Sequence, residues 1–349
     1  MNKKLENILI PIIAVLMALL IGAGIIAYLG ENPLTAYYYM FTGAFSTEKA
    51  VARTLLEATP MIFTGLAVLF AFKGGMFNIG AQGQITIAAL TAAGIGAFVT
   101  NTFINNVFVI ILISVIVGFL WAMIAGVLKS RLGIHEVIST IMLNYIAVNI
   151  EQYLINYPLK QGGPTGPNPQ TPPVLDSAKL TQLMPWTNEA LNYGFIIAIV
   201  LTIIVWYIFE KTVLGYEIKA VGNNPTASEN AGINVKWIMA ITLGLSGLIA
   251  SFAGAERVLG GVGQYTYKQG LLATFGFDGI SVALLGKNNP FGAFAAAILF
   301  AALRVGGRAM QFNTSIPSQI VIMIQAIIIL LIAAENMFRF ILEKRKKGE

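Results

Sequence analysis

The sequence predicts an all-helical integral membrane protein with about ten transmembrane helices. Of the 349 residues, 56% are apolar and 11% are Asp, Glu, Lys or Arg, whereas about 25% of a soluble protein is charged. The apolar residues gather in runs that are long enough to cross a bilayer, and the basic residues lie mostly between these runs. So little charge cannot coat a globule of this size in water, which excludes a soluble protein.

The composition also excludes several kinds of functional site. No cysteine is present, which removes disulfides, thiolate metal sites and cysteine nucleophiles. A single histidine, His135, argues against a histidine-based metal or acid–base site, and we expect it to be a solvated residue of a short cytoplasmic turn. No Walker A, zinc-protease or nucleophile-elbow motif occurs. We therefore expect no enzyme, no catalytic residue, no metal and no cofactor.

The first apolar run, residues 8–29, is 22 residues long, carries no charge and follows Lys3 and Lys4. A crossing helix needs about 20 apolar residues, and the apolar region of a secretory signal is shorter. This run therefore predicts an uncleaved first span whose N-terminus is cytoplasmic.

Nine further runs predict the remaining spans. The run 50–72 is interrupted by Pro60. Because the short Gly-rich runs are weak signals, a total of eight or nine spans is an alternative. The region 156–190 contains seven prolines, which block regular structure and predict an external loop. The nine runs are 50–72, 85–99, 107–128, 137–155, 191–209, 237–252, 275–285, 291–303 and 316–334.

The basic residues predict the orientation of the chain. With ten spans, fourteen Lys and Arg residues fall in loops on the side of the N-terminus, and eight fall in loops on the other side. Cytoplasmic loops carry an excess of basic residues, so both termini are predicted to be cytoplasmic. The net charge of +6 is explained by this distribution, and a nucleic-acid partner is not expected.

The ten spans divide into a leading helix, a group of four, a connecting helix and a second group of four with the opposite topology. A Gly-broken stretch lies in each group, at 73–84 and at 274–280. Paired interruptions in inverted repeats indicate a transport path at the repeat interface. The alternative is that the glycines allow close helix packing.

Few ionisable residues fall near the predicted spans, which argues against a transporter coupled to an ion gradient. The candidates are Glu151, Glu256, Arg257 and Asp278. We expect Glu256 and Arg257 to form an interfacial charge pair on the outer side, and Asp278 to snorkel or to pair with Arg257.

The predicted cytoplasmic loop 211–236 contains a complete set of signals for a short helix. Asn224 is a capping residue, Pro225 suits the first helical position, and Gly232 suits the position after the helix. These signals predict a helix over 225–231. A helix of seven residues is unstable alone in water, so we expect it to dock on another protein, such as a separate ATPase.

Several segments resemble a known family. Residues 214–215 (LG), 220–225 (AVGNNP) and 231–233 (AGI) resemble the coupling loop of ABC importer permeases of the branched-chain amino acid and sugar type. Residues 77–84 (FNIGAQGQ) and 141–145 (IMLNY) resemble the nucleoside and simple-sugar branch of that family.

This resemblance implies a single permease domain, residues 1–349, in the plasma membrane of a bacterium. It implies the longer of two unequal nucleoside permeases, acting with an ATP-binding subunit, a second and different permease chain, and an extracellular substrate-binding lipoprotein. Simple sugars such as ribose are the alternative substrates. An ion-coupled secondary transporter is the rival function, and a membrane enzyme is a third, disfavoured one.

Two groups of residues are the candidate sites. Uncharged polar side chains at membrane depth are expected either to face a central cavity at the interface with the second permease or to form interhelical hydrogen bonds. Ala227 and Ala231, four residues apart, share one smooth face of the predicted coupling helix, and Glu229 is placed to meet a basic rim. The path candidates are Asn78, Gln82, Gln84 and Asn144, and the coupling candidates are Asn224, Pro225, Ala227, Glu229, Ala231 and Gly232.

Overall fold

The computed structural model describes residues 3–272 and 274–334, with side chains from residue 11 onward. The basic tail at 344–347, which contributed to the predicted orientation, lies outside these residues. The described residues form helices and loops, without a β-strand. The α-helices are α1 (Lys3–Tyr28), α2 (Pro33–Phe45), α3 (Glu48–Lys73), α4 (Ala81–Phe98), α5 (Val107–Leu132), α6 (Glu136–Asn156), α7 (Gly194–Lys211), α8 (Val213–Asn223), α9 (Pro225–Asn230), α10 (Val235–Leu259), α11 (Phe275–Leu285), α12 (Pro290–Asn313) and α13 (Gln319–Ala333).

Every predicted apolar run coincides with a helix. Six helices are long and apolar enough to cross a membrane, namely α1, α3, α5, α7, α10 and α12, and α11 and α13 are shorter apolar helices. The helices α2 and α8 were not predicted, because neither forms an apolar run of membrane length. The prediction of an all-helical membrane protein is confirmed at this level.

The expected interruption at Pro60 is wrong, since α3 continues through it from Glu48 to Lys73. A proline inside a helix leaves the carbonyl four residues earlier without its partner. That carbonyl belongs to Leu56, and it accepts a hydrogen bond from Nη2 of Arg257 at 3.4 Å. A side chain from α10 therefore satisfies the group that the proline leaves unpaired.

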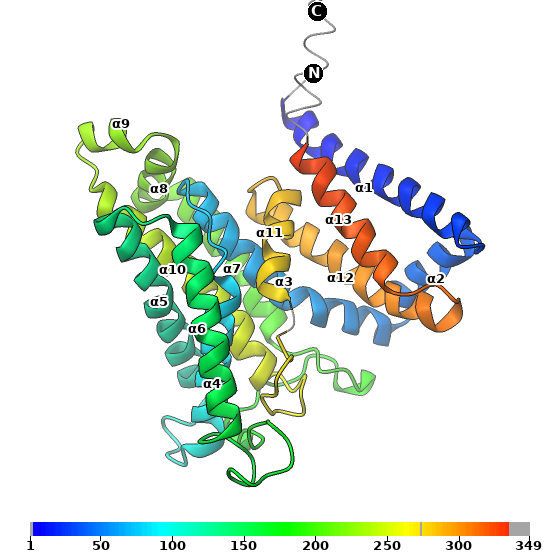
Figure 1. Ribbon diagram of the computed structural model, residues 1–349, viewed down its shortest axis with the longest axis horizontal. Coiled ribbons are helices and arrows are strands. Elements are labelled where there is room, and N and C mark those ends of the chain that lie inside the picture. The colour runs from blue at the N-terminus through cyan, green and yellow to red at the C-terminus, as the bar shows by residue number, and fades with distance from the viewer. Residues whose placement is uncertain (1–2, 273, 335–349) are drawn as a thin grey trace, which may run out of the picture.

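The helices form two groups with α3 and α11 between them (Figure 1). On one side, α10 packs on α5 and α4, and on the other side α12 packs on α2 and α3, while α1 packs on α13. The contact between α5 and α10 depends on small residues, because a Cβ on Gly118 would lie 1.6 Å from Oγ of Ser251. Such close approach is how membrane helices associate without a hydrophobic driving force between them.

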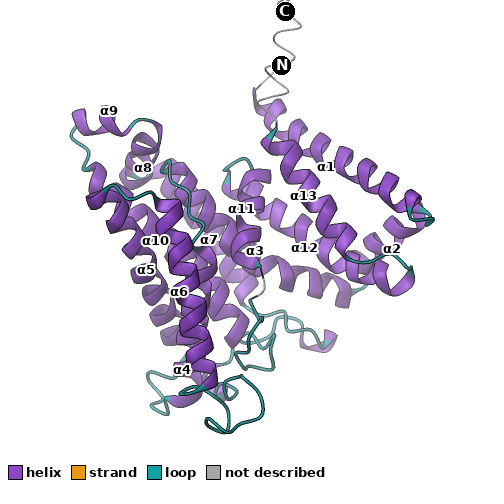
Figure 2. Ribbon diagram, in the orientation of Figure 1, coloured by secondary structure: helices purple, strands orange, loops and turns teal. Residues whose placement is uncertain are grey.

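The Pro-rich segment forms loop structure with two single 3-10 turns, Asp176–Ala178 and Pro185–Thr187. It lies at the end of the molecule opposite α9 (Figure 2). Backbone hydrogen bonds hold it there, from Leu180 N–H to the Leu259 carbonyl at 2.8 Å and from Thr171 N–H to the Tyr267 carbonyl at 2.9 Å. The loop therefore covers one end of the bundle, and α8 and α9 project from the other.

Candidate transport path and coupling surface

Asn78 is completely buried beside the start of α4. Its Nδ2 donates to Oγ of Ser246 at 2.8 Å and to Oε1 of Gln84 at 3.1 Å, and its Oδ1 accepts from the Gly80 N–H at 2.9 Å. The Ser246 hydroxyl in turn donates to the Ala67 carbonyl at 2.6 Å. This cluster joins the broken segment before α4 to α10 and α3.

Asn144 stabilises the same region from α6. Its Oδ1 accepts from the Gly83 N–H at 2.8 Å, and its Nδ2 donates to the Ile79 carbonyl at 2.9 Å. The first N–H groups of a helix have no partner within the helix, and Gly80 at the start of α4 has no side chain to cap them. Asn144 supplies this cap from another helix.

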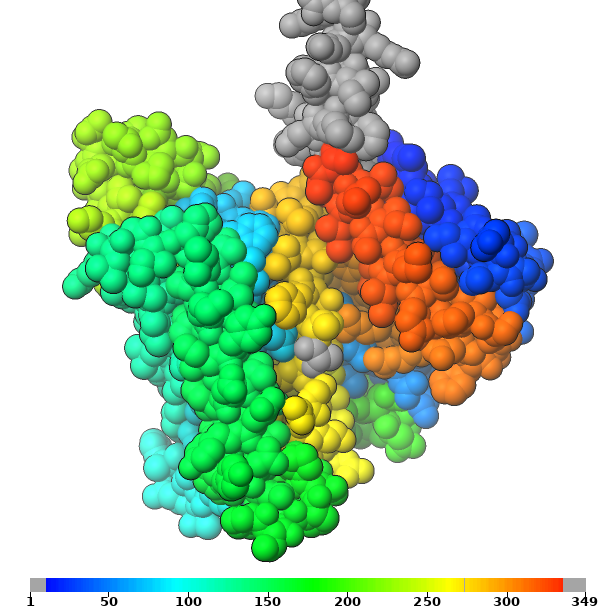
Figure 3. All heavy atoms as spheres, viewed as in Figure 1, coloured from blue at the N-terminus to red at the C-terminus, as the bar shows by residue number. Residues whose placement is uncertain are grey.

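Gln82 joins the two Gly-broken segments. Its Oε1 accepts from the Gly276 N–H at 2.9 Å. Gly276 lies in the first turn of α11, where an N–H has no partner within the helix. A Cβ on Gly276 would lie 2.4 Å from the backbone nitrogen of Gln82, so only glycine permits this contact. The starts of α4 and α11, far apart in the sequence, therefore meet, with α11 between α6 and α13 on the face in Figure 3.

The four path candidates thus gather around the first turn of α4. Asn78, Gln84 and Asn144 are buried, and their side chains make the interhelical and segment-to-helix hydrogen bonds that were the alternative role. Gln82 is half-buried and lies where the two broken segments touch.

We expect Asn78→Leu and Asn144→Leu to destabilise the fold more than they change substrate preference. Each substitution leaves buried backbone groups unpaired, which costs about 1–3 kcal/mol. Thermal unfolding in detergent measures this cost. Asn149→Leu is the control, because Asn149 is exposed and, among the described residues, its side chain bonds only to the Tyr145 carbonyl of its own helix. Unchanged melting temperatures with a changed substrate preference would contradict the structural role.

A chain of ion pairs runs through α3, α10 and α12. Arg257 is 2% exposed, and its Nη2 lies 3.2 Å from Oε2 of Glu57. Glu57 also pairs with Arg308, at 3.2 Å between Oε1 and Nη1. Glu256 lies on the other side of Arg257, with 3.9 Å between Oε2 and Nε, and accepts from Nδ2 of Asn192 at 2.8 Å. The expected interfacial pair is therefore part of a buried network.

Asp278 pairs with Arg304 rather than with Arg257, so that expectation is wrong. The Arg304 Nη2 lies 2.7 Å from Oδ2 of Asp278, and both Arg257 and Arg304 lie over the ring of Phe275, at 4.4 and 5.3 Å from its centroid. The predicted span 291–303 ends just before Arg304, because charges end apolar runs. In the structure α12 continues to Asn313, since the opposite charges on α3 and α11 neutralise its arginines.

Two remaining titratable candidates have structural partners. Glu151 is buried and accepts from the Tyr267 hydroxyl at 2.8 Å. The exposed His135 caps α6, since its Nδ1 accepts from the Val137 N–H at 3.3 Å. Burial raises the pKa of the neighbouring Glu136, but the hydrogen bond and charge of Lys129, 2.8 Å away, outweigh it, so this pKa lies below its usual value.

The coupling candidates form α9 as the local signals predict. Oδ1 of Asn224 accepts from the Ala227 N–H at 3.0 Å, and Pro225 is the first helical residue. At the other end Gly232 has a φ of +85°. The N–H groups of Gly232 and Ile233 bond to the carbonyls of Glu229 and Ser228 at 2.9 and 3.0 Å, which is a Schellman motif. The helix ends at Asn230, one residue earlier than predicted.

The outer face of α9 is free of contacts within the described part of the chain. Ala227, Glu229 and Ala231 are exposed. The helix α9 follows directly after α8. The end of α8 lies so close to the end of α3 that a Cβ on Gly222 would be 2.3 Å from the Lys73 carbonyl oxygen. Thr212 caps α8, since its Oγ1 accepts from the Gly215 N–H at 3.1 Å, and this cap is a local signal from which α8 could have been predicted.

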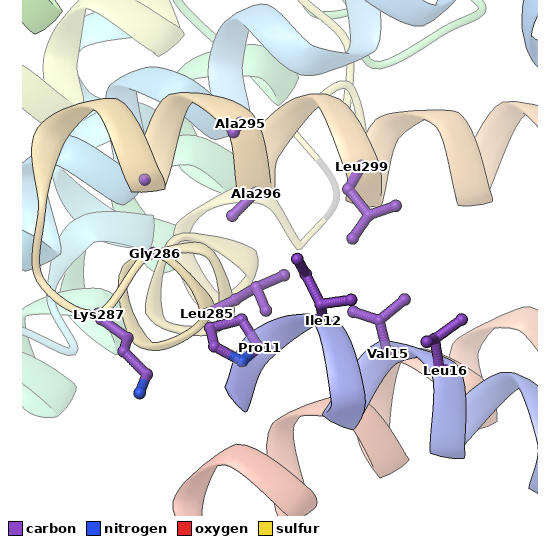
Figure 4. Close-up of a pocket in the computed structure, with 11 residues that line it drawn as sticks. Pro11, Ile12, Val15, Leu16, Leu285, Gly286, Lys287, Ala295, Ala296 and Leu299 are labelled. Carbon is purple, nitrogen blue, oxygen red and sulfur yellow. The ribbon is translucent and has the colours of Figure 1, made fainter. Parts of the chain in front are cut away.

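An apolar groove of about 440 Å³ lies between α1 and the α11–α12 turn (Figure 4). Pro11, Ile12 and Leu16 face Leu285 and Leu299 across it. Its walls are almost wholly hydrocarbon, so it fits the interior of a membrane better than a polar solute.

Comparison with known proteins shows the family of the chain. Residues 50–333 match the family described as the permease component of branched-chain amino acid transport systems. The chain is 36% identical to the guanosine ABC transporter permease NupP of Bacillus subtilis, with 99% of each chain covered. It is 35% identical to the nucleoside ABC transporter permease NupB of Lactococcus lactis, covering 99% of this chain and 96% of NupB.

A third relative is the glucose ABC transporter permease TsgB13 of Haloferax volcanii, 29% identical over 94% of this chain and 88% of its own length. The two bacteria above also have a second, less similar permease each, NupQ and NupC. No solved structure matches the chain.

The family match covers most of the chain, and the similarity to the ABC permeases NupP and NupB is full-length. Together with the six long apolar helices, it makes the chain a multi-pass plasma-membrane protein. The chain belongs to the family of permease components of branched-chain amino acid-type ABC transport systems.

Proposed function

We propose that the chain is the longer of two unequal permease subunits of an ABC importer that carries nucleosides. The observation that carries this proposal is the full-length similarity to two permeases named for guanosine and for nucleosides. Glucose transport by the more distant relative keeps simple sugars as the second candidate substrate class.

In this proposal ten helices cross the membrane, both termini are cytoplasmic, and two groups of four helices form inverted repeats. The contact between Gln82 and Gly276 supports the repeat relationship, because interrupted helices of inverted repeats meet at the site of transport. The loop 156–190 is then external, and the segment 211–236 is cytoplasmic.

The partners follow from the two ends of the molecule. The exposed α9 docks on an ATP-binding subunit. The covered end, formed by the Pro-rich loop, faces an extracellular substrate-binding lipoprotein. A second, different permease completes the path, as the paired NupP/NupQ and NupB/NupC names suggest. Gln82 contacts the substrate, and Asn78, Gln84 and Asn144 hold the segment that carries it.

We expect uptake by the reconstituted importer to require ATP and to favour ribonucleosides over ribose. No P-loop occurs in this chain, so a separate ATP-binding subunit has to supply the energy. The buried carboxylate of Glu256 already pairs with Arg257. The measurement is uptake of labelled guanosine and ribose into proteoliposomes, with and without ATP.

Dissipating the proton gradient while ATP is held constant serves as the control and should leave uptake unchanged. Uptake that follows a pH gradient without ATP would support a secondary transporter. ATP-dependent uptake of ribose alone would assign the chain to sugars.

A further inference from the structure

A cleft with several polar side chains in a mainly apolar lining lies between α11, α12 and α13. It consists of two adjoining cavities of about 130 and 250 Å³ that share Arg304, Ile322 and Gln325. The smaller one extends along α13 to Ala326 and Ile329, and the larger one opens toward Ser318, where α13 begins.

Asp278 presents an available acceptor to this cleft. Its Oδ2 accepts from Nη2 of Arg304 at 2.7 Å and from Oγ1 of Thr274 at 3.0 Å. Its Oδ1 accepts no hydrogen bond within the described part of the chain, and the side chain is 24% exposed. A carboxylate accepts up to four hydrogen bonds, so half of this group's capacity is unused.

Other polar atoms converge on the same space. Nε2 of Gln325 donates to the Phe300 carbonyl at 3.1 Å, which orients its amide and leaves Oε1 as a second acceptor. The Ser281 hydroxyl, one turn further along α11 than Asp278, also lines the smaller cavity. Small-molecule sites are concave spaces with a few converging polar groups of this kind.

The ion pair of Arg304 and Asp278 is more exposed than an ion pair that only holds two helices together. The pair of Arg257 and Glu57 has side-chain exposures of 2% and 13%, whereas Arg304 and Asp278 are 20% and 24% exposed. Charged groups at membrane depth are expensive unless they face water, protein or a polar solute. A pair that serves only to hold α11 on α12 gains nothing from facing a cleft.

The cleft also adjoins the meeting point of the two broken helices. Asp278 is two residues after Gly276, which bonds to Gln82. On the face in Figure 3, α11 is flanked by α13 and α6, so the cleft borders the region assigned above to the transport path.

We propose that Asp278 is a substrate-recognition residue of the path and that its Oδ1 accepts hydrogen bonds from a pair of adjacent O–H or N–H donors on the nucleoside. Arg304 is the positioning residue that fixes the carboxylate. The inference rests on the proposed function. Two donor pairs have this chemistry, the ribose diol and the N–H edge of guanine, and the substrates in the test distinguish them.

The test is uptake by the complete importer, with all its subunits, in proteoliposomes supplied with ATP. Asp278→Asn keeps the size of the side chain and removes its charge. We expect ribonucleoside uptake to fall about tenfold or more, which is the loss expected for a hydrogen bond to a charged group, with unchanged subunit assembly. Glu210→Gln is the matched control, because it removes the carboxylate of an ion pair, with Lys219 at 3.9 Å, that lies outside the cleft.

The choice of substrate identifies the donor pair. If the ribose diol is recognised, the Asp278→Asn substitution lowers guanosine and adenosine uptake equally. It then does not change uptake of the 2′,3′-dideoxy analogues, which lack the diol. If the guanine edge is recognised, guanosine uptake falls and adenosine uptake does not.

Two further variants keep the inference falsifiable. If the double variant Asp278→Arg, Arg304→Asp restores uptake, the pair is only a clamp and the proposal fails. Ser281→Phe leaves the ion pair intact and fills the cleft, so normal uptake by this variant would also overturn the proposal. A wild-type importer that carries no nucleoside would refute the proposed function itself, whereas wild-type uptake with an unaffected Asp278→Asn variant refutes this inference alone.

Discussion

The variant Ala227→Arg is expected to abolish transport while leaving the permease folded and inserted. Ala227 is exposed on α9, so an arginine there meets nothing in its own chain. If α9 docks on the ATP-binding subunit as proposed, a bulky charge would have to enter that interface, at an order-of-magnitude cost of several kcal/mol from clash and desolvation. The measurements are nucleoside uptake and co-purification of the ATP-binding subunit.

Leu132→Arg is the matched control for this prediction. Leu132, the last residue of α5, is 68% exposed, and the substitution places the same charge outside α9. Normal uptake and normal ATPase binding by Ala227→Arg would show that α9 is only a surface turn. Loss of insertion would show instead that α9 packs on the membrane body.

Arg257→Met is expected to have the largest effect on stability. The substitution preserves an apolar stem but leaves the carboxylates of Glu57 and Glu256 without their shared partner, and it also frees the Leu56 carbonyl beside Pro60. Removing one member of a buried ion pair costs about 3–5 kcal/mol. The yield of folded protein and its thermal unfolding in detergent measure this loss.

Arg53→Met is the comparison, since Arg53 pairs with Glu189 but its side chain is 49% exposed, and such pairs contribute about 0–1 kcal/mol. If Arg257→Met is as stable as Arg53→Met, the network does not hold α10 against α3. If adding Glu57→Gln to Arg257→Met recovers part of the stability, the cost is due to the unpaired carboxylate.

The features that could be predicted from the sequence depend on neighbouring residues. The caps of α9, Asn224 and Gly232, lie within nine residues of each other and act on the nearest backbone groups, so their order in the chain determines the helix. The apolar runs predicted the helices for a similar reason, because a segment that lies in lipid must satisfy its own backbone hydrogen bonds.

The features that could not be predicted depend on residues far apart in the chain. Asn78 bonds to Ser246, and Arg257 compensates for Pro60, and no local pattern connects the members of either pair. For the same reason the predicted end of α12 at residue 303 is too early. Arg304 is typical of a loop unless its distant partner Asp278 is known.

The sequence by itself determined the membrane environment, the apolar helices and the short helix α9, because hydrophobic length and capping act within one segment. It also left two roles open for the polar residues near Gly80 and Gly276. Only the tertiary structure shows their partners: Asn78, Gln84 and Asn144 are buried in hydrogen bonds, Gln82 joins the two broken helices, and Asp278 lines a cleft. The physical reason is that a polar group at membrane depth must find a partner, and which partner it finds is set by the packing of helices that are distant in the sequence.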